Sequence, residues 1–390
     1  MSVTFPLGFR ATGIASGIKE NGNLDLAVIA AQTQEPCVCA ATFTKNLAAA
    51  APVLLSKANI LASGGRAGAV LLSSGNANAA TGKKGDQDAL ASITSLSNEL
   101  GLDPCQVLVG STGLIGIPMP ITRLLNAIPE AAKNLLQDES GGLLAAQAIM
   151  TTDTFPKLAK FEHKGVKFGG IAKGAAMISP NMATMLAVIT CDAATDHQML
   201  SRVLLRAVDE SFNRITIDGC TSTNDSVFVM ASGLSEISLS EDDLFIGMQA
   251  ICNDLAGQIV FDAEGASKLI KVQVLGASTE QDALIVARKI ANSSLVKCSF
   301  FGRDPYWGRV LSEVGSSGVN LDINRVSISY GEMLVYQNRE EVTVDKAALN
   351  QIMQEREVRL LVDLALGDCG ALITTADLTP AYIAENMRTS

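Results

Sequence analysis

The chain has 390 residues, of which 48% are hydrophobic, 18% are charged and only 4% are aromatic. This length and composition predict two or three domains with cores of aliphatic side chains, and they exclude the disordered and collagen-like classes. The formal net charge of −10 disfavours nucleic acid and anionic membrane surfaces as partners, because like charges repel.

Cysteine usage and the N-terminal sequence indicate a cellular compartment. The eight cysteines include no CxxC pair, which favours reduced thiols over a disulfide framework. The start MSVTFPLGFR lacks the basic and apolar regions of a signal peptide, and no stretch reaches the roughly 18 apolar residues of a membrane span. We therefore expect a soluble, cytoplasmic protein.

Histidine is scarce, and this limits the chemistry. His163 lies in the charged segment KFEHKGVKF and His197 follows Asp196 at the start of a predicted helix, so both are expected at the surface. Serine–histidine catalysis and multi-histidine metal sites are disfavoured. Proton transfer must then use a carboxylate, a lysine or a terminal amine.

Alternating helix and strand patterns predict a mixed α/β architecture. In chain order, helices are expected over 86–101, with Asp86 as N-cap and Gly101 at the end, and over 196–212, 240–256, 282–291 and 345–354. Strands are expected over 69–72, 270–274 and 358–366, with a hairpin over 326–336 that turns at Gly331 and Glu332. A change in composition near 276–279 predicts a C-terminal subdomain over 278–390.

Two glycine-rich segments in the first half have partial similarity to nucleotide-binding motifs. The segment GNANAATGK, residues 75–83, departs from a P-loop, which needs a Ser or Thr where Lys84 stands. The segment GSTGLIG, residues 110–116, lacks the glycine spacing of a dinucleotide fingerprint. It is either a tight surface turn or a pair of donors, in which the Thr112 hydroxyl and a glycine N–H converge on a developing oxyanion.

The segment over 169–192 is glycine-rich and apolar, which predicts a strand, a turn and a second strand in the core. Burial of Lys173 or Thr184 there is costly unless each has a partner. ITIDGCTSTNDS, residues 215–226, predicts a solvated hairpin around Asp218 and Asp225, without the acid spacing of a calcium loop.

FGRDPYWGR, residues 301–309, contains the only tryptophan, Trp307. Its neighbours are Asp304 and two arginines. A structural stacking role and a binding role remain open for this segment.

Taken together, these motifs resemble the ornithine acetyltransferase family, the glutamate N-acetyltransferases of the acetyl-cycling arginine pathway. The resemblance begins at GFRATGIASGIK, residue 8, and covers nearly the whole chain. The blocks that carry it are KGAAMISPNMATML, STGLIG, MTTDTFPK, SGNANAATG, FNRITIDGCTSTND, DAEG and DPxWGR.

The resemblance implies self-cleavage between Ala183 and Thr184. The products would be an α chain, residues 1–183, and a β chain, residues 184–390, which together form an αββα layered core. It also implies that α and β chains pair into an α2β2 heterotetramer. A smaller C-terminal α/β subdomain completes the expected fold.

The resemblance also implies roles for particular residues. Thr184 matches the nucleophile, and Thr112 with Gly113 matches the oxyanion pair. The tail ENMRTS is one residue shorter than the usual pattern. Positions that match substrate-binding residues are Thr151, Lys173, Thr184, Glu264, Asn386 and Ser390.

The implied reaction suits a histidine-poor chain. Cleavage releases an α-amine on Thr184 with a pKa near 7.7, so nucleophile and base lie on one residue. The acetyl group of N2-acetylornithine would pass to glutamate by double displacement through acetyl-Thr184, with no metal or tightly bound cofactor. Some family members also accept acetyl-CoA as donor.

Three alternatives stay open. The chain could be a self-processing amidohydrolase or aminopeptidase of related fold, in which water takes the acyl group. It could be a binding homologue that has lost activity. Lys173 could form a structural ion pair, with Glu264 as a candidate partner, in place of binding a substrate carboxylate.

Overall fold

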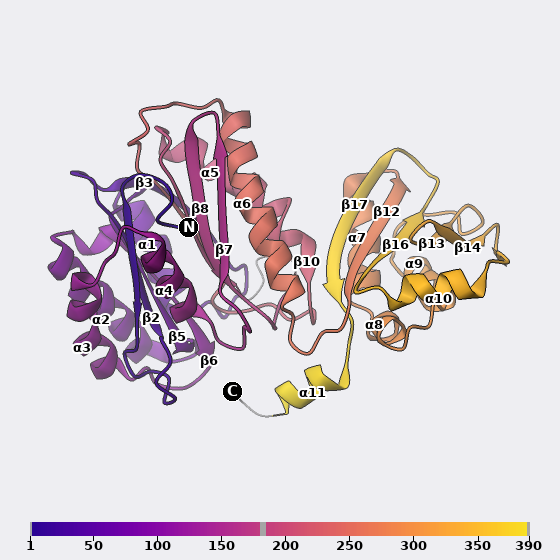
Figure 1. Cartoon of the computed structure of the whole chain (residues 1–390), viewed down its shortest axis with the longest axis horizontal. Coiled ribbons are helices and arrows are strands. Elements are labelled where there is room, and N and C mark those ends of the chain that lie inside the picture. Colours follow the sequence, from indigo (N-terminus) through magenta and orange to yellow (C-terminus); the bar gives the residue numbers. More distant parts are fainter. Residues whose placement is uncertain (1, 180–184, 388–390) are drawn as a thin grey trace. The chain divides into compact units, whose positions relative to one another are not determined.

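The computed structural model describes residues 2–179 and 185–387, and the chain divides into two compact units (Figure 1). The first unit comprises Met1–Asn213 and Cys220–Asp262, and the second comprises Arg214–Gly219 and Ala263–Thr389. The second unit starts before the predicted position 278, because the strand Leu269–Ala277 pairs with two later strands of that unit.

The first unit contains two β-sheets and the helices that cover them. Its helices are α1 (Ala51–Ala62), α2 (Gly82–Leu100), α3 (Ile121–Lys133), α4 (Glu139–Ile149), α5 (His197–Asp209) and α6 (Glu241–Phe261). Its strands are β1 (Phe9–Ile14), β2 (Leu26–Ala31), β3 (Cys37–Phe43), β4 (Arg66–Ala67), β5 (Ala69–Asn76), β6 (Val107–Leu114), β7 (Lys157–His163), β8 (Val166–Lys173), β9 (Leu186–Cys191) and β11 (Ser226–Ala231).

These elements form an αββα sandwich, as the family resemblance implied. One sheet has the order β1-β2-β5-β6 and the other has the order β4-β3-β11-β9-β8-β7. A buried apolar core lies between the sheets and includes the inner side chains of α4. A second core packs α2 and α3 on the outer face of the first sheet. On the second sheet, α5 packs against β3, and α6 packs against β7 and β8. In Figure 1 the layers run from α3 on the left to α6 on the right of this unit.

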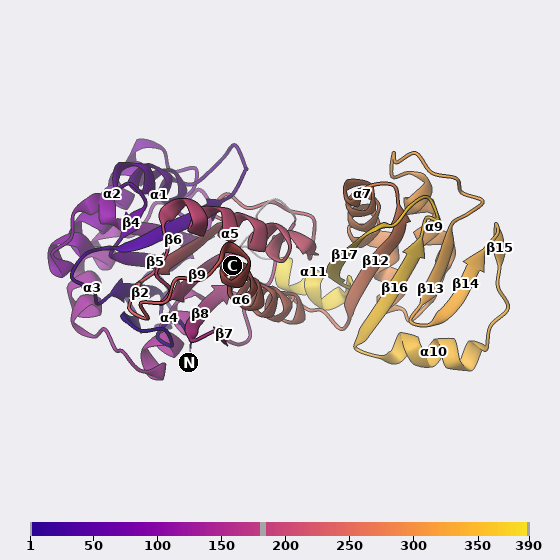
Figure 2. The same ribbon diagram turned by 90° about the horizontal axis from the view of Figure 1, so that it is seen from above.

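The second unit is built on one mixed sheet with the order β10-β17-β12-β16-β13-β14-β15, and Figure 2 shows the strands from β17 to β15 side by side in this order. The helix α7 packs on β17 and β12. The strands are β10 (Ile215–Thr216), β12 (Leu269–Ala277), β13 (Ser327–Tyr330), β14 (Met333–Gln337), β15 (Glu340–Glu341), β16 (Glu357–Asp363) and β17 (Cys369–Ala376). The helices are α7 (Glu280–Ala291), α8 (Ser294–Phe301), α9 (Trp307–Gly315), α10 (Lys346–Gln354) and α11 (Pro380–Asn386).

Local capping explains why the predicted helices are present. Asp196, Ser240 and Asp345 each accept hydrogen bonds from first-turn N–H groups of α5, α6 and α10. Gly101 ends α2 with a φ of 67°, as predicted. The start of α2 was predicted wrongly, because the helix begins at Gly82 and Asp86 lies inside it.

Several strand predictions are also confirmed, and two loop predictions are wrong. The predicted hairpin is β13 and β14. Residues 110–114 are not a surface turn but the end of β6, which pairs in parallel with β5. Residues 215–226 are not a hairpin, because β10 and β11 belong to different sheets and Asp225 is fully buried.

The cysteines form no disulfides, and each histidine ring has a polar partner. All eight cysteines are free. Nε2 of His163 lies 3.0 Å from Asp243 Oδ1, and Nδ1 of His197 lies 2.7 Å from the Cys39 carbonyl. Both rings are half-buried, so each histidine lies at the surface with part of its ring covered.

The expectation that no stretch is long and apolar enough for a membrane span needs correction. Among the described residues, α6 passes that test by length and composition. Half of its apolar window is buried in this unit, and the helix packs on β7, β8 and α5. Core helices have the same pattern, so α6 is weak evidence for a span.

Candidate active site

The site begins where β5 and β6 end side by side. In the parallel register Gly75 lies opposite Gly113. Gly113 has a φ of +126°, and a Cβ atom added to it would lie 2.4 Å from the Gly75 carbonyl carbon. Only glycine allows both this backbone conformation and this close approach. The glycine at position 113 therefore determines the backbone conformation directly after Thr112.

Thr112 and Lys173 meet, although they come from different sheets. Lys173 ends β8 and is 3% exposed, and Thr112 is 4% exposed. The Lys173 ammonium donates to Thr112 Oγ1 over 3.4 Å. Two of the residues predicted from the motifs are thus adjacent inside the sandwich. A buried cation beside a threonine hydroxyl can stabilise negative charge that develops in a bound molecule.

Asp153 supplies the negative charge that balances Lys173. Burial raises the pKa of this carboxyl, but the cations of Lys173 and Lys157 and the N–H of Gly174 outweigh burial and hold the pKa at about 2. Asp153 is therefore ionised at neutral pH. It also accepts the N–H of Thr151 over 2.9 Å and the N–H of Gly174 over 2.7 Å.

A second buried lysine extends this network. The Lys157 ammonium lies 2.6 Å from carboxylate oxygens of both Asp153 and Asp262 and is fully buried. Asp262 also accepts the N–H of Thr154 over 2.9 Å. Sequence reasoning missed Asp153, Lys157 and Asp262. The block MTTDTFPK contains the first two, but nothing local indicates that Asp262 lies beside them.

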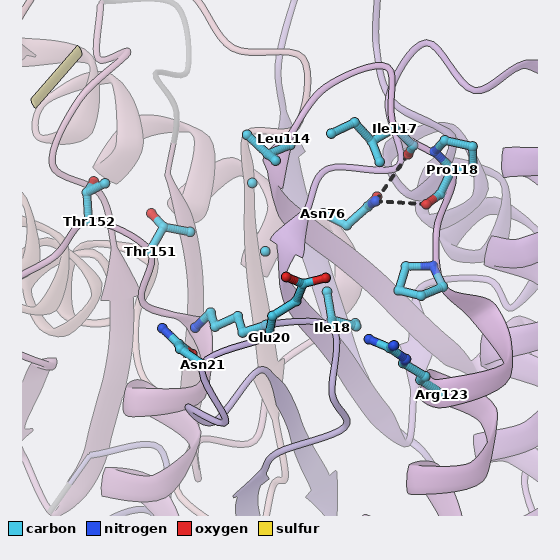
Figure 3. Close-up of a pocket in the computed structure, with 14 residues that line it drawn as sticks. Ile18, Glu20, Asn21, Asn76, Leu114, Ile117, Pro118, Arg123, Thr151 and Thr152 are labelled. Atoms are coloured by element: carbon cyan, nitrogen blue, oxygen red, sulfur yellow. Dashed lines mark hydrogen bonds between the residues drawn. The ribbon is translucent and has the colours of Figure 1, made fainter. Parts of the chain in front are cut away.

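A cavity of about 840 Å³ opens next to these residues (Figure 3). Gly113 and Thr151, both predicted site residues, lie in its wall. Asn76 donates to the carbonyls of Ile117 and Pro118, and so fixes the loop after β6. The charged and polar lining that sequence reasoning missed comprises Lys19, Glu20, Asn21, Asn76, Arg123 and Thr152.

The Lys19 ammonium donates hydrogen bonds to main-chain carbonyls and not to a carboxylate. Its ammonium donates to Leu24 O over 2.8 Å and to Met150 O over 2.7 Å. Burial lowers the pKa of Lys19, with a smaller contribution in the same direction from Lys173, while Asp25 and Asp153 act to raise it. A smaller cavity of about 430 Å³ shares Lys19 and Thr151 with the larger one.

Asp225 is the most unusual carboxyl group of the region. It is 0% exposed, and its Oδ1 accepts the N–H of Met185, the residue after Thr184, over 3.0 Å. Its Oδ2 has no hydrogen-bond partner in the described part of the chain. Burial raises the pKa of Asp225 well above its usual range, although hydrogen bonds from Met185 and Ser222 and the charge of Lys173 act to lower it.

Asn224, directly before Asp225, connects β11 to the end of β6. Its Nδ2 donates to Ala77 O over 2.6 Å and to Ser111 O over 2.9 Å. The TSTND segment is therefore a buried connection between the two sheets. The sequence offered one signal for this role, the match of FNRITIDGCTSTND to a family block.

The remaining predicted residues belong to other parts of the chain. Ala183, Thr184 and Ser390 lie outside the described residues. In the second unit, Asn386 Nδ2 donates to Glu264 Oε2 over 2.8 Å. Within residues 2–179 and 185–387, no group of three or more His, Cys, Asp or Glu side chains is arranged to hold a metal ion.

The stacking role considered for residues 301–309 is present in the second unit. The Trp307 ring stacks on Tyr336, with centroids 4.6 Å apart and planes at 29°. Both rings contribute to the apolar core of that unit. This segment therefore has a packing function.

Comparison with known proteins identifies the family. The model of the ArgJ family matches residues 10–389. The arginine biosynthesis bifunctional protein ArgJ of Streptomyces avermitilis is 44% identical over 387 residues, which are 99% of each chain. The protein of the same description from Mycobacterium tuberculosis is 42% identical and covers 98% of this chain and 95% of that one.

Two solved structures are also similar to this chain. The M. tuberculosis ornithine acetyltransferase complexed with ornithine is 39% identical and covers 46% of this chain and 94% of that chain, with a TM-score of 0.44. The arginine biosynthesis bifunctional protein of Bacillus halodurans is 37% identical and covers 50% and 95%, with a TM-score of 0.49. The family match and the full-length relatives show that the chain belongs to the ArgJ family.

Proposed function

We propose that the protein transfers the acetyl group of N2-acetylornithine to glutamate, in arginine biosynthesis, through an acetyl ester on Thr184. The observation that carries the proposal is the buried Lys173 ammonium beside Thr112, next to a cavity whose wall includes Gly113. Membership of the ArgJ family supplies the substrates, since full-length relatives are described as bifunctional proteins of arginine biosynthesis.

The active enzyme forms by cleavage between Ala183 and Thr184. The Thr184 hydroxyl attacks the Ala183 carbonyl carbon, and the peptide C–N bond breaks as the proton passes to nitrogen. Water then hydrolyses the resulting ester and restores the hydroxyl. The new α-amine has an ordinary pKa near 7.7, so a useful fraction is neutral at pH 7 and accepts the hydroxyl proton.

Acetyl transfer uses this amine as a base in both half-reactions. The Thr184 oxygen attacks the acetyl carbonyl of N2-acetylornithine, and ornithine leaves with the proton that the amine returns to its nitrogen. The α-amino group of glutamate then attacks the acetyl ester, and the Thr184 hydroxyl is regenerated. Thr112 Oγ1 and the Gly113 N–H stabilise the tetrahedral oxyanion in both steps.

Lys173 and Thr151 bind the group that both substrates share, the α-carboxylate. Lys173 is buried and its charge is balanced by Asp153, so it stays fixed when one substrate replaces the other. The Thr151 N–H is already committed to Asp153, which leaves its hydroxyl for the substrate. Glu264, Asn386 and Ser390 are proposed as further substrate contacts from the β chain, which follows from the family resemblance alone.

Mass spectrometry of the purified protein tests the cleavage. Two chains, residues 1–183 and 184–390, are expected to copurify, and N-terminal sequencing of the second should begin Thr-Met-Leu-Ala. Thr184→Ala should stay as one chain. An active protein that consists of the intact chain alone would refute the role of Thr184 as a new N-terminus. The native mass of the same sample shows whether the protein forms the proposed α2β2 assembly.

An ornithine-release assay distinguishes the transferase from a hydrolase of related fold. Ornithine should accumulate beyond one equivalent only when glutamate is present, and N-acetylglutamate should form in equal amount. Stoichiometric acetylation of the Thr184 peptide is expected with N2-acetylornithine alone. Continued release without glutamate would favour an amidohydrolase, and no release would favour a binding homologue. Because the relatives are described as bifunctional, acetyl-CoA is the second donor to test.

A further inference from the structure

The cavity beside Gly113 carries one carboxylate and one guanidinium that do not pair with each other. Glu20 lies between β1 and β2, and Arg123 lies in the first turn of α3. Figure 3 shows the Glu20 carboxylate directed into the cavity and Arg123 reaching it from the α3 side. The ion pairs formed by residues 2–179 and 185–387 include neither side chain.

Two other polar side chains in this wall, Lys19 and Asn76, are held by hydrogen bonds to the protein. Both hydrogen bonds of the Lys19 ammonium go to main-chain carbonyls. The Asn76 amide nitrogen donates to Ile117 and Pro118, and its oxygen accepts the N–H of Asn78 over 2.8 Å.

Arg123 is different, because its guanidinium makes one hydrogen bond to the described residues. Its Nη1 donates to Gly17 O over 2.7 Å, which anchors the guanidinium and uses one of its five N–H donors. Lys19 keeps its charge, but carbonyl contacts hold it beside Thr151, so Glu20 and Arg123 are the charged side chains of this wall that the described residues hold least.

The proposed substrates differ at one position. N2-acetylornithine and glutamate share an α-carbon, an α-carboxylate and an α-nitrogen, but ornithine ends in a distal ammonium and glutamate in a distal carboxylate. Both react in turn at the same nucleophile, so both distal groups enter the same region. A cavity wall with charges of only one sign would attract the distal group of one substrate and repel that of the other.

We propose that Glu20 and Arg123 form a distal-group subsite, in which Glu20 binds the distal ammonium of N2-acetylornithine and Arg123 binds the distal carboxylate of glutamate. The proposal rests on the proposed function and specifies which residues discriminate between its two substrates. An arginine suits this task because its planar fork matches a carboxylate. The apolar wall formed by Ile18, Leu114 and Ile117 accommodates the methylene groups of both side chains.

The test is a pair of neutralising variants measured against both substrates. Glu20→Gln should raise the KM for N2-acetylornithine about 5- to 20-fold and leave the KM for glutamate within about twofold. Arg123→Gln should do the reverse. These factors lie at the lower end for a charge-assisted hydrogen bond, because both side chains are solvent-exposed. The kcat at saturating substrate should persist in both, since neither residue touches the reacting atoms.

Glu130→Gln on α3 is the matched control, because it removes one exposed carboxylate outside the cavity. It should change neither KM. Equal changes of both KM values in either variant, or unchanged values in both, would overturn the subsite. These outcomes differ from a failure of the proposed function, in which the unmodified protein itself would transfer no acetyl group to glutamate.

Discussion

Replacement of Lys157 by methionine tests whether the buried charge network supports the site. The Lys157 ammonium is fully buried at 2.6 Å from both Asp153 and Asp262. Methionine keeps the length and apolar stem of the side chain but removes the charge. Two buried carboxylates would then lose their common cation, and Asp153 would retain Lys173 and the weaker influence of Lys19 as positive charges.

The magnitude follows from two estimates. Removing one partner of a buried ion pair typically costs ~3–5 kcal/mol, because the remaining charge is left desolvated. The Asp153 pKa, lowered from 3.8 to about 2, corresponds to ~2 kcal/mol of stabilisation of the ionised native form. Because this pKa is depressed on folding, that stabilisation is fully present above about pH 4 and is lost as the pH falls through about 2. The penalty of Lys157→Met should therefore be largest at neutral pH and shrink on acidification from about pH 4.

Urea unfolding followed by circular dichroism measures this, in the Thr184→Ala background so that each sample is one chain. Hydrogen exchange of peptides that contain β7 assigns the transition to the first unit. Lys160→Met on the same strand is the control, because Lys160 is exposed and its replacement should change the free energy of unfolding by less than about 0.5 kcal/mol. A Lys157→Met protein as stable as the control at pH 7, or a penalty that grows on acidification, would refute the reasoning.

Two further variants test the groups nearest the reaction. Thr112→Val should lower kcat for acetyl transfer about 10²- to 10³-fold with little change in KM, because it removes one oxyanion donor; steady-state rates on fully cleaved protein measure this, and an unchanged kcat contradicts the assignment. Lys173→Met should raise KM for N2-acetylornithine and for glutamate by similar factors of about 10 to 150, since both substrates lose the same carboxylate contact. A loss of thermal stability or of cleavage with normal KM values would indicate a structural role for Lys173.

The fold was predictable where the controlling interactions are local. Asp196, Ser240 and Asp345 cap their helices through neighbours two or three residues away, so sequence alone located α5, α6 and α10. The helix α3 contains Pro129, and α4 has two glycines in its first turn, so local preference argued against both. Packing against the sheets stabilises these helices, and no local pattern reports that packing.

The candidate site, like the fold, has a part that could be predicted from sequence and a part that could not. Thr112, Gly113 and Lys173 could be selected because they lie in motifs, and two of them meet in the structure. The charged partners Asp153, Lys157, Asp262 and Asp225 also lie in these blocks, but the sequence does not show which of them pair. Lys157 and Asp262 are more than 100 residues apart in sequence, and Asp225 is buried although its segment is polar. Long-range pairing of charges depends on the tertiary fold.

The strand order of the second sheet has a consequence for how the protein holds together. The strands β9 and β11 follow residue 184, yet they lie between β3 and β8, which precede it. If the chain were cleaved between β8 and β9, the strands β9 and β11 of the C-terminal piece would be paired on both sides with strands of the N-terminal piece, β8 and β3. Release would require opening two strand interfaces inside a buried core, so exchange of pieces between molecules should be as slow as global unfolding. The break would change the covalent connectivity while the two pieces behave, kinetically, as a single molecule.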